Sequence, residues 1–217
     1  MSGKRLVGAL IGGGLVALTY YVVRRKRRRV SRPGEGGAPV AQRRCVVDGC
    51  DVYYVEGSES DGVIGLLECE SSCAVGLDVE WSPTHPAIAT VQIASASRCV
   101  VARVVDGALG EATRAFLESR VCAGVGVHED ARKMKRDLDV DVSRCADLRV
   151  VARERCGYPK GARDGLAALA MTYAPSASLP HKVDESVRRG DWRSPHLSLK
   201  QIEYAAGDAI ASYKALV

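Results

Sequence analysis

The chain has 217 residues, of which 47% are hydrophobic and 5% aromatic, so one domain of about 150 residues with an aliphatic core is expected beside additional segments. The net charge of +5 is unevenly spread, because residues 1–44 carry 11 Lys and Arg against one acid, which leaves a balance of −5 on residues 45–217. An acidic domain does not bind nucleic acid by bulk electrostatics, so such binding is excluded unless metal ions or a local basic patch supply positive charge.

The first predicted element is a membrane span, because residues 6–23 contain no charged side chain. As a helix this segment would be about 27 Å long, close to the thickness of a bilayer core. Six consecutive basic residues, 24–29, follow it in place of a cleavage site, so we expect an uncleaved signal anchor over residues 1–30. The positive-inside rule then places the following domain in the cytosol. A buried core helix is the alternative, and the flanking charges fit it poorly.

A short span with basic flanks suits the mitochondrial outer membrane better than thicker membranes, and the endoplasmic reticulum is the alternative location. Gly8 and Gly12 form a GxxxG spacing that would permit a homodimer, although such spacings arise readily by chance in glycine-rich spans. Residues 31–44 begin with "SRPGEGGAP", a composition typical of a flexible linker, and we expect the folded domain to occupy residues 45–217.

Within this domain, short β-branched runs alternate with helical patterns. Strands are predicted at residues 50–56, 73–81, 87–95, 99–105, 121–127 and 142–148. Helices are predicted at residues 62–70, 110–119, 129–138, 148–156, 165–173 and 198–216. The third and fourth strands are separated by a short turn and form an antiparallel hairpin, so the expected fold is an α/β domain with a mixed sheet.

Acidic residues recur beside the apolar segments of this domain. Asp78 and Glu80 end the second predicted strand and, being two residues apart, point to the same face of it. Asp130 begins a helix, and Tyr204 and Asp208 lie four residues apart on one face of the last helix. Carboxylates that converge at one sheet edge would repel each other unless hard divalent cations such as Mg²⁺ or Mn²⁺ bind between them. Taken singly, each residue also fits an ordinary role as a helix cap, a surface acid or a core aromatic.

Three segments resemble, in order and spacing, the exonuclease motifs of the DEDDy 3′–5′ exonucleases of the RNase H-like superfamily: "GLDVEW", "VGVHEDARKMKRDL" and "LSLKQIEYAAGDA". Two further segments, "GLAALAMTY" and "VRRGDW", extend a resemblance that runs from about residue 46 to the C-terminus and is strongest to Werner-type exonuclease domains. The anchor before such a domain is similar to the exonuclease 3′–5′ domain-containing proteins of the mitochondrial outer membrane. The resemblance implies an RNase H-like, five-stranded mixed sheet flanked by helices.

The resemblance also implies roles for the acidic residues. Asp78, Glu80 and Asp208 would bind a Mg²⁺ or Mn²⁺ ion near the nucleophile. Asp78 and Asp130 would hold a second ion, the latter through water. Tyr204 would orient the attacking water, since a tyrosine with a pKa near 10 is a poor base at neutral pH.

The reaction implied is metal-dependent hydrolysis at the 3′ end of single-stranded or frayed DNA or RNA, with release of nucleoside 5′-monophosphates. The side chains expected to contact this substrate are Lys182, Arg188, Arg193, Trp81 and Gln92. Further candidates for phosphate contacts are Arg132, Lys133, Lys135, Arg136 and Arg189. A solvated surface is the alternative role for the basic residues, and packing at the strand end is the alternative for Trp81. An endonuclease, or a catalytically idle membrane-tethered nucleic-acid-binding or scaffold domain, is the alternative function.

Overall fold

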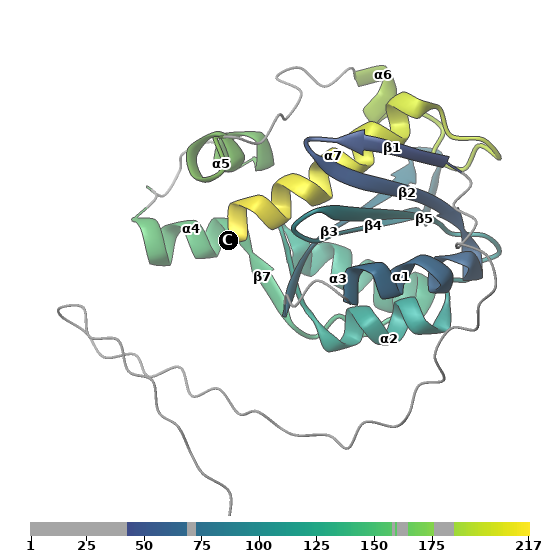
Figure 1. Ribbon diagram of the computed structural model, residues 1–217, viewed down its shortest axis with the longest axis horizontal. Coiled ribbons are helices and arrows are strands. Elements are labelled where there is room, and N and C mark those ends of the chain that lie inside the picture. The colour runs from purple at the N-terminus through teal and green to yellow at the C-terminus, as the bar shows by residue number, and fades with distance from the viewer. Residues whose placement is uncertain (1–42, 69–72, 158, 160–164, 176–184) are drawn as a thin grey trace, which may run out of the picture. The chain divides into compact units, whose positions relative to one another are not determined.

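The computed structural model describes residues 43–68, 73–157, 159, 165–175 and 185–217 (Figure 1). The predicted anchor at residues 6–23 lies outside these ranges, as does nearly all of the predicted linker. No helix within the described ranges combines the length and the apolarity needed to cross a membrane.

The strands of the described part form one mixed sheet of seven, in the order β1-β2-β5-β4-β3-β6-β7. Their bounds are β1 Arg43–Val47, β2 Cys50–Glu56, β3 Ala74–Ser82, β4 His85–Ala94, β5 Arg98–Arg103, β6 Val121–Gly124 and β7 Cys145–Asp147. The pairs β1–β2, β3–β4 and β4–β5 are antiparallel, whereas β2–β5, β3–β6 and β6–β7 are parallel. The predicted hairpin between the third and fourth strands is β4–β5.

The sheet has more strands than the five that the resemblance implied, and that expectation is therefore wrong. β1 was not predicted, because it starts with two arginines at the end of the basic N-terminal region. It forms because Asp48 and Gly49 adopt φ angles of 50° and 79°. Positive φ at both central residues allows the two-residue turn that returns the chain antiparallel onto β2. β7 has three residues and is shorter than the segment predicted at 142–148.

The predicted helices are present to within two residues at each end. The helices described are a 3₁₀ turn Gly57–Glu59, α1 Ser60–Glu68, α2 Glu111–Ser119, α3 Val127–Leu138, α4 Leu148–Cys156, α5 Leu166–Tyr173, α6 Glu185–Arg188 and α7 Leu199–Leu216. The short α6 was not predicted. α7 begins with a capping box in which Ser198 and Gln201 satisfy each other's backbone N–H groups.

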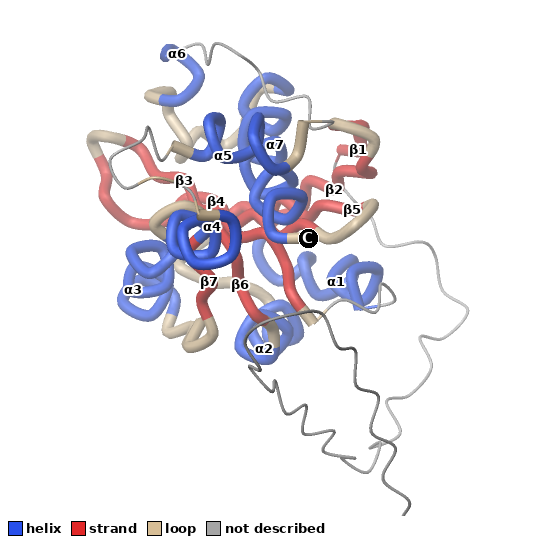
Figure 2. The backbone as a smooth tube through the Cα atoms, turned by 90° about the vertical axis from the view of Figure 1, so that its left-hand side faces the viewer, coloured by secondary structure: helices blue, strands red, loops and turns tan. Residues whose placement is uncertain are grey.

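Helices cover both faces of the sheet. Figures 1 and 2 show α1, α2 and α3 on one face and α7 across the other. Val75, Leu77 and Val79 of β3 are buried in the core with residues of α1, α2 and α3. Because side chains alternate along a strand, Asp78 and Glu80 point to the opposite face, where α7 lies.

α7 approaches β3 closely at Gly76. A Cβ atom built at this position would lie 2.0 Å from the carbonyl oxygen of Ala209, so a larger side chain would displace the helix. The buried side of α7 is correspondingly rich in small residues, among them Ala205, Ala206 and Gly207. This close approach places Asp208, which precedes Ala209, over the end of β3 that carries the two acids.

Candidate active site

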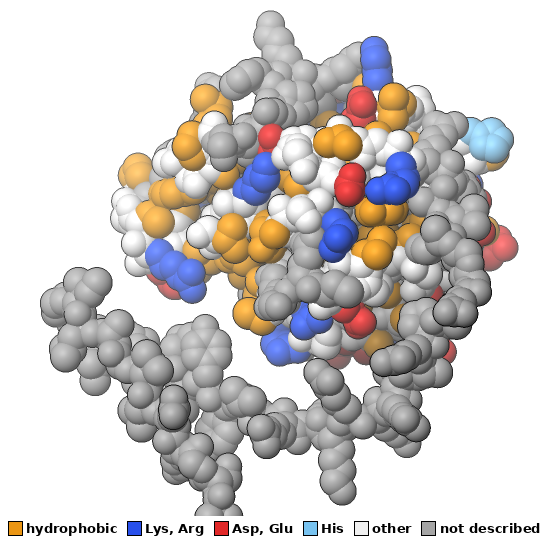
Figure 3. Space-filling model, in the orientation of Figure 1, with side chains coloured by type: hydrophobic (Ala, Val, Ile, Leu, Met, Phe, Trp, Pro, Cys, Tyr) orange, Lys and Arg blue, Asp and Glu red, His pale blue; other side chains and the backbone are white. Residues whose placement is uncertain are grey.

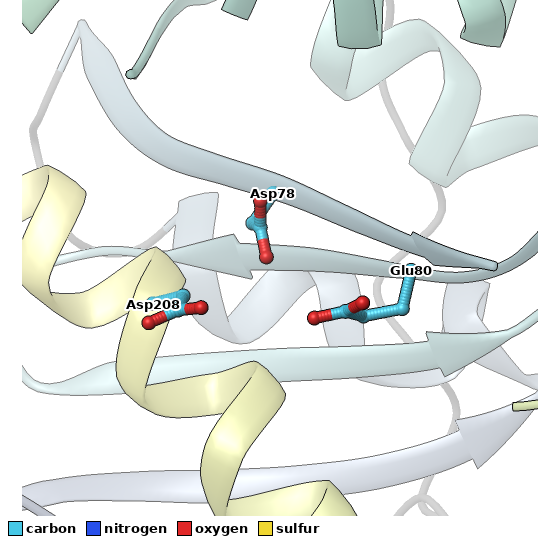
Figure 4. Close-up of side chains that lie close together, drawn as sticks. All are labelled: Asp78, Glu80 and Asp208. Atoms are coloured by element: carbon cyan, nitrogen blue, oxygen red, sulfur yellow. The ribbon is translucent and has the colours of Figure 1, made fainter. Parts of the chain in front are cut away.

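Three carboxylates from two elements converge above β3. Asp78 and Glu80 come from β3 and Asp208 from α7, and one oxygen of each lies within 4.8 Å of those of the other two. Figure 4 shows the three side chains directed toward a common point between the strand and the helix. Each side chain is partly exposed. The sequence-predicted acids Asp78, Glu80 and Asp208 are therefore brought together, with spacing that suits a shared cation.

The electrostatics of this cluster are unfavourable in the absence of a cation. Burial raises the pKa of Asp78 well above its ordinary value, and the charges of Asp208, Glu80 and Asp130 raise it further. Burial, followed by the charges of Asp208 and Asp130, raises the pKa of Glu80 to about 8. Burial also raises the pKa of Asp208 to about 6, although a hydrogen bond from Tyr204 opposes the change. The cluster thus has an excess of negative charge that a divalent cation would compensate.

Asp130 lies in the same cleft but outside the group of three. The cleft has a volume of about 640 Å³ and is lined by Asp78, Val79, Glu80, Trp81, Pro83, Val125, Gly126, Glu129, Asp130, Arg149, Arg188, Arg189, Tyr204 and Asp208. Asp130 is in the first turn of α3, and burial together with Glu129 raises its pKa to about 6. Because its charge raises the pKa of both acids of β3, Asp130 is within electrostatic reach of them.

Tyr204 lies one turn before Asp208 on α7 and faces the same cleft. Burial raises its pKa, and so do the charges of Asp208 and Glu80. The phenol therefore stays protonated at neutral pH, where it can donate a hydrogen bond but cannot act as a base. Its ring packs against buried Trp192, with 6.1 Å between the ring centroids.

Trp192 also ties α6 to the end of β3. Its backbone N–H donates to Ser82 Oγ at 2.9 Å, and its indole Nε1–H donates to the carbonyl oxygen of Arg188 at 3.1 Å. The hydroxyl of Ser82 donates in turn to Asp191 Oδ1 at 3.1 Å. The two bonds of Ser82 join residues that are more than 100 apart in the sequence, and together with the local bond to Arg188 they fix the segment from which Arg188 enters the cleft.

Of the five side chains expected to contact the substrate, Trp81 and Arg188 line the cleft, and Arg189, one of the further candidates for phosphate contacts, lines it too. Trp81 is 41% exposed at the end of β3, and Lys133 Nζ lies 4.6 Å from its ring centroid. Arg188 is exposed and pairs with Glu185 at 3.0 Å. A second hollow of about 530 Å³ also includes Trp81 and continues along α3 past Arg132, Lys133 and Arg136. Lys133 and Arg136 both pair with Asp137, so their charge is partly compensated.

The other three predicted contacts lie elsewhere. Arg193 is exposed, but it is not among the residues that line the cleft. Gln92 has no exposed surface, and its Nε2 donates to Thr90 Oγ1 at 2.6 Å. The substrate contact predicted for Gln92 is wrong for this structure, because the central strand β4 is covered on both faces. Lys182 lies outside the described residues.

Two charged residues of the cleft, Arg149 and Glu129, were not predicted. Arg149 follows Asp147, the N-cap of α4, whose Oδ1 accepts the backbone N–H of Arg149 at 2.9 Å. That cap can be read from the sequence, but it does not reveal that α4 begins at the cleft. On the face shown in Figure 3, basic, acidic and hydrophobic side chains are interspersed, without a continuous basic patch.

Comparison with known proteins identifies related sequences. A family described as 3′–5′ exonuclease matches residues 62–216. An Arabidopsis thaliana protein named 3′–5′ exonuclease is 32% identical over 162 residues, which cover 70% of this chain and 54% of that protein. The Drosophila melanogaster exonuclease 3′–5′ domain-containing protein 2 is 28% identical over 216 residues, which cover 93% of this chain and 35% of that protein. The chain therefore spans about half or less of the length of these relatives.

Solved structures share the fold. Brucella melitensis NrnC superposes with a TM-score of 0.61 and 16% identity, over 76% of this chain and 78% of that one. Structures of that protein are described as bound to pGG and as having bound Mg²⁺. At this identity the likeness shows that the mixed sheet and its flanking helices form a known arrangement.

Proposed function

Because the chain belongs to the 3′–5′ exonuclease family, we propose that it removes nucleotides from the 3′ end of DNA or RNA and releases nucleoside 5′-monophosphates. One observation carries the proposal: Asp78, Glu80 and Asp208 gather within 4.8 Å of one another in an open cleft. A structural role does not explain this cluster, since the raised pKa values mean that its charges oppose folding.

The donor set fits a hard divalent cation. All three side chains offer carboxylate oxygens, which suit Mg²⁺ and Mn²⁺ better than soft metals. Asp78, Glu80 and Asp208 would hold one ion, and Asp78 with Asp130 would hold a second. Two such ions would stabilise the attacking and leaving oxygens of a displacement at phosphorus.

The side chains of the cleft position the reactants. Tyr204, as a protonated phenol, orients the attacking water beside Glu80 and Asp208. The departing 3′ oxygen of the shortened strand lies toward Asp130. Trp81 offers an exposed ring for stacking with a base, and Arg188 offers a guanidinium for a phosphate. Arg193 stays in the proposal as a contact outside the cleft, and Lys182, which lies outside the described residues, stays a prediction.

A single-stranded or frayed end suits this cleft better than an intact duplex end. The terminal phosphate has to reach carboxylates that are themselves partly buried, and a single strand allows the neighbouring bases to separate and stack on protein side chains. pGG, which the Brucella protein binds, is a short single strand of this kind. Both DNA and RNA meet these requirements.

The proposed location is a membrane, with the domain on its cytosolic side. The uncharged segment at residues 6–23 and the basic run after it support an anchor, with the mitochondrial outer membrane as the first choice and the endoplasmic reticulum as the second. The homodimer that Gly8 and Gly12 would permit stays a prediction.

The test is a cleavage assay on a 5′-labelled single strand with Mg²⁺ or Mn²⁺. The wild-type chain should shorten the strand from its 3′ end and release mononucleotides, and the double variant Asp78→Asn, Glu80→Gln should lose this activity. Glu203→Gln is the matched control, because Glu203 is an exposed acid of α7 that does not line the cleft. Full activity of the double variant would refute the mechanism, and cleavage of a circular strand would indicate an endonuclease.

A further inference from the structure

Arg149 is a cation built into the wall of the cleft. It stands in the first turn of α4, and its side chain is 39% exposed. The other arginines that line the cleft within the described residues, Arg188 and Arg189, lie at the end of the four-residue α6 and pair with exposed Glu185. Arg149 is held much more firmly, because its partner is a buried carboxylate.

That partner is Asp147, which is 6% exposed. Its two oxygens accept Nε–H and Nη2–H of Arg149 at 3.0 and 2.7 Å, which is a bidentate arrangement. Asp147 Oδ2 also accepts the backbone N–H of Gly126 at 3.2 Å. Although burial alone raises the pKa of Asp147, the bonds from Arg149 outweigh it, and the pKa is lowered. The carboxylate therefore stays ionised and fixes the guanidinium against the turn before α3.

The position of the guanidinium is set by that turn. Gly126 is the N-cap of α3 and has φ of 75°. Glycine provides this backbone conformation, and a Cβ atom built on it would lie 3.4 Å from Arg149 Nη2, so the guanidinium lies directly against the turn. Asp130 follows one helical turn later on α3. Arg149 is thus held beside the end of α3 that carries Asp130.

We propose that Arg149 binds the phosphate next to the scissile one, on the strand that remains after cleavage. This inference rests on the proposed function, in which the departing 3′ oxygen lies toward Asp130, so the rest of the strand leaves the cleft on this side. A guanidinium has five N–H donors in a planar fork and can serve a carboxylate and a phosphate together. Because Asp147 already orders the side chain, little conformational entropy is lost on binding.

The competing explanation is that the Asp147–Arg149 pair only stabilises the fold. Capping of α4 needs only the carboxylate of Asp147 and the backbone N–H of Arg149, so it does not require the guanidinium in the cleft. The two explanations predict different effects of replacing Arg149 on short and long substrates. A phosphate contact affects only substrates that have a second phosphate, whereas a structural role affects every substrate equally.

The kinetic test compares two substrates with the full chain. Thymidine 5′-monophosphate p-nitrophenyl ester has one phosphate, and a short oligothymidylate has several. Arg149→Gln should raise KM for the oligonucleotide by about 10-fold and affect the ester much less. Arg155→Gln, an exposed arginine on the same helix outside the cleft, is the matched control and should leave both substrates unaffected. Equal losses on both substrates, or no loss on either, would overturn the proposal.

A binding measurement separates this inference from the proposed function. Fluorescence anisotropy is measured with Mn²⁺ present, on a labelled oligothymidylate whose 3′ linkages are cleavage-resistant phosphorothioates, so that binding is observed without catalysis. Arg149→Gln should weaken binding and reduce the slope of log K against log salt by about 0.7, which is the effect of one lost phosphate contact on a single strand. Asp147→Asn should also weaken binding, because the guanidinium loses the carboxylate that fixes its position. If the wild type cleaves the oligonucleotide but Arg149→Gln binds it with unchanged affinity and slope, this inference alone fails.

Discussion

Glu80 makes the stability of the cation-free protein depend on pH. Burial and neighbouring charges raise its pKa to about 8, whereas a glutamate in an unfolded chain has a pKa of about 4.3. Between these two values the folded protein binds more protons than the unfolded chain, so the free energy of unfolding falls as the pH rises. The stability that is fully present below the unfolded pKa is therefore lost as the pH passes through the folded pKa.

Removing this charge should stabilise the cation-free protein at alkaline pH. In a chelating buffer at about pH 8.5, we expect Glu80→Gln to have a Tm at least about 2 °C above that of the wild type, with the difference narrowing toward pH 5. Thermal unfolding followed by circular dichroism measures both values. Glu203→Gln should behave like the wild type. A Glu80→Gln curve that matches the wild type at both pH values would show that the charges of the cluster do not oppose folding.

The hydroxyl of Tyr204 should matter for the rate of cleavage and not for binding of the cation. Its raised pKa keeps it protonated, so it can orient a water molecule by hydrogen bonding. Tyr204→Phe keeps the packing against Trp192 and should lower kcat about 100-fold, while the rise in Tm on addition of Mn²⁺ is retained. Single-turnover cleavage and thermal unfolding are the two measurements. An unchanged kcat would remove Tyr204 from the mechanism.

The sequence predicts individual site residues well where a local pattern determines the face to which their side chains point. The two-residue spacing of Asp78 and Glu80 puts both on one face of a strand. Arg149 could not be found in this way, because its place in the cleft depends on where α4 starts in three dimensions. Gln92 was assigned wrongly because a strand pattern does not reveal that a helix covers its second face.

The contact between β3 and α7 assembles the site from the two ends of the domain. At Gly76 an added Cβ would meet the backbone of α7 at 2.0 Å, so Gly76→Ala has to displace the helix. We expect this variant to lose about 1–3 kcal/mol of unfolding free energy and to show a smaller rise in Tm on addition of Mn²⁺, because Asp208 moves away from Asp78. Denaturant and thermal unfolding measure the two effects.

Gly65 provides the control for this variant. It is an exposed glycine inside α1 with nothing within 4 Å of an added Cβ. Gly65→Ala should stabilise the protein by about 0.5–1 kcal/mol and leave the effect of Mn²⁺ unchanged. If Gly76→Ala is as stable as the wild type and responds equally to Mn²⁺, the close approach does not set the geometry of the site.

Most helices and strands were predicted, and even the short β6 and β7 lie within predicted strands, whereas β1 and α6 were not predicted. α7 and β3 carry long, consistent patterns. β1 starts in the basic N-terminal region and α6 has only four residues, and these two elements form where β1 pairs with β2 and α6 contacts α7. The pair Asp48–Gly49, which follows two valines and precedes Cys50, is the local signal from which the β1–β2 turn could have been recognised.

The membrane anchor predicted at residues 6–23 lies outside the described residues and can be tested on the full chain. If residues 6–23 span a bilayer, the full chain should remain in the membrane pellet after extraction with alkaline carbonate, and a chain that starts at residue 37 should be soluble. Fractionation followed by immunoblotting measures this. Release of the full chain by carbonate would contradict the predicted anchor, whereas the proposal for the exonuclease site does not depend on this result.

The position of a bound divalent ion tests the account most directly. Crystals of the domain grown with Mn²⁺ and measured for anomalous scattering should show an ion whose ligands are carboxylate oxygens of Asp78, Glu80 and Asp208, at about 2.0–2.6 Å. The same experiment with Asp78→Asn, Glu80→Gln should show no ion there. An ion bound away from these three side chains, or none at a Mn²⁺ concentration that supports cleavage, would contradict the proposed mechanism.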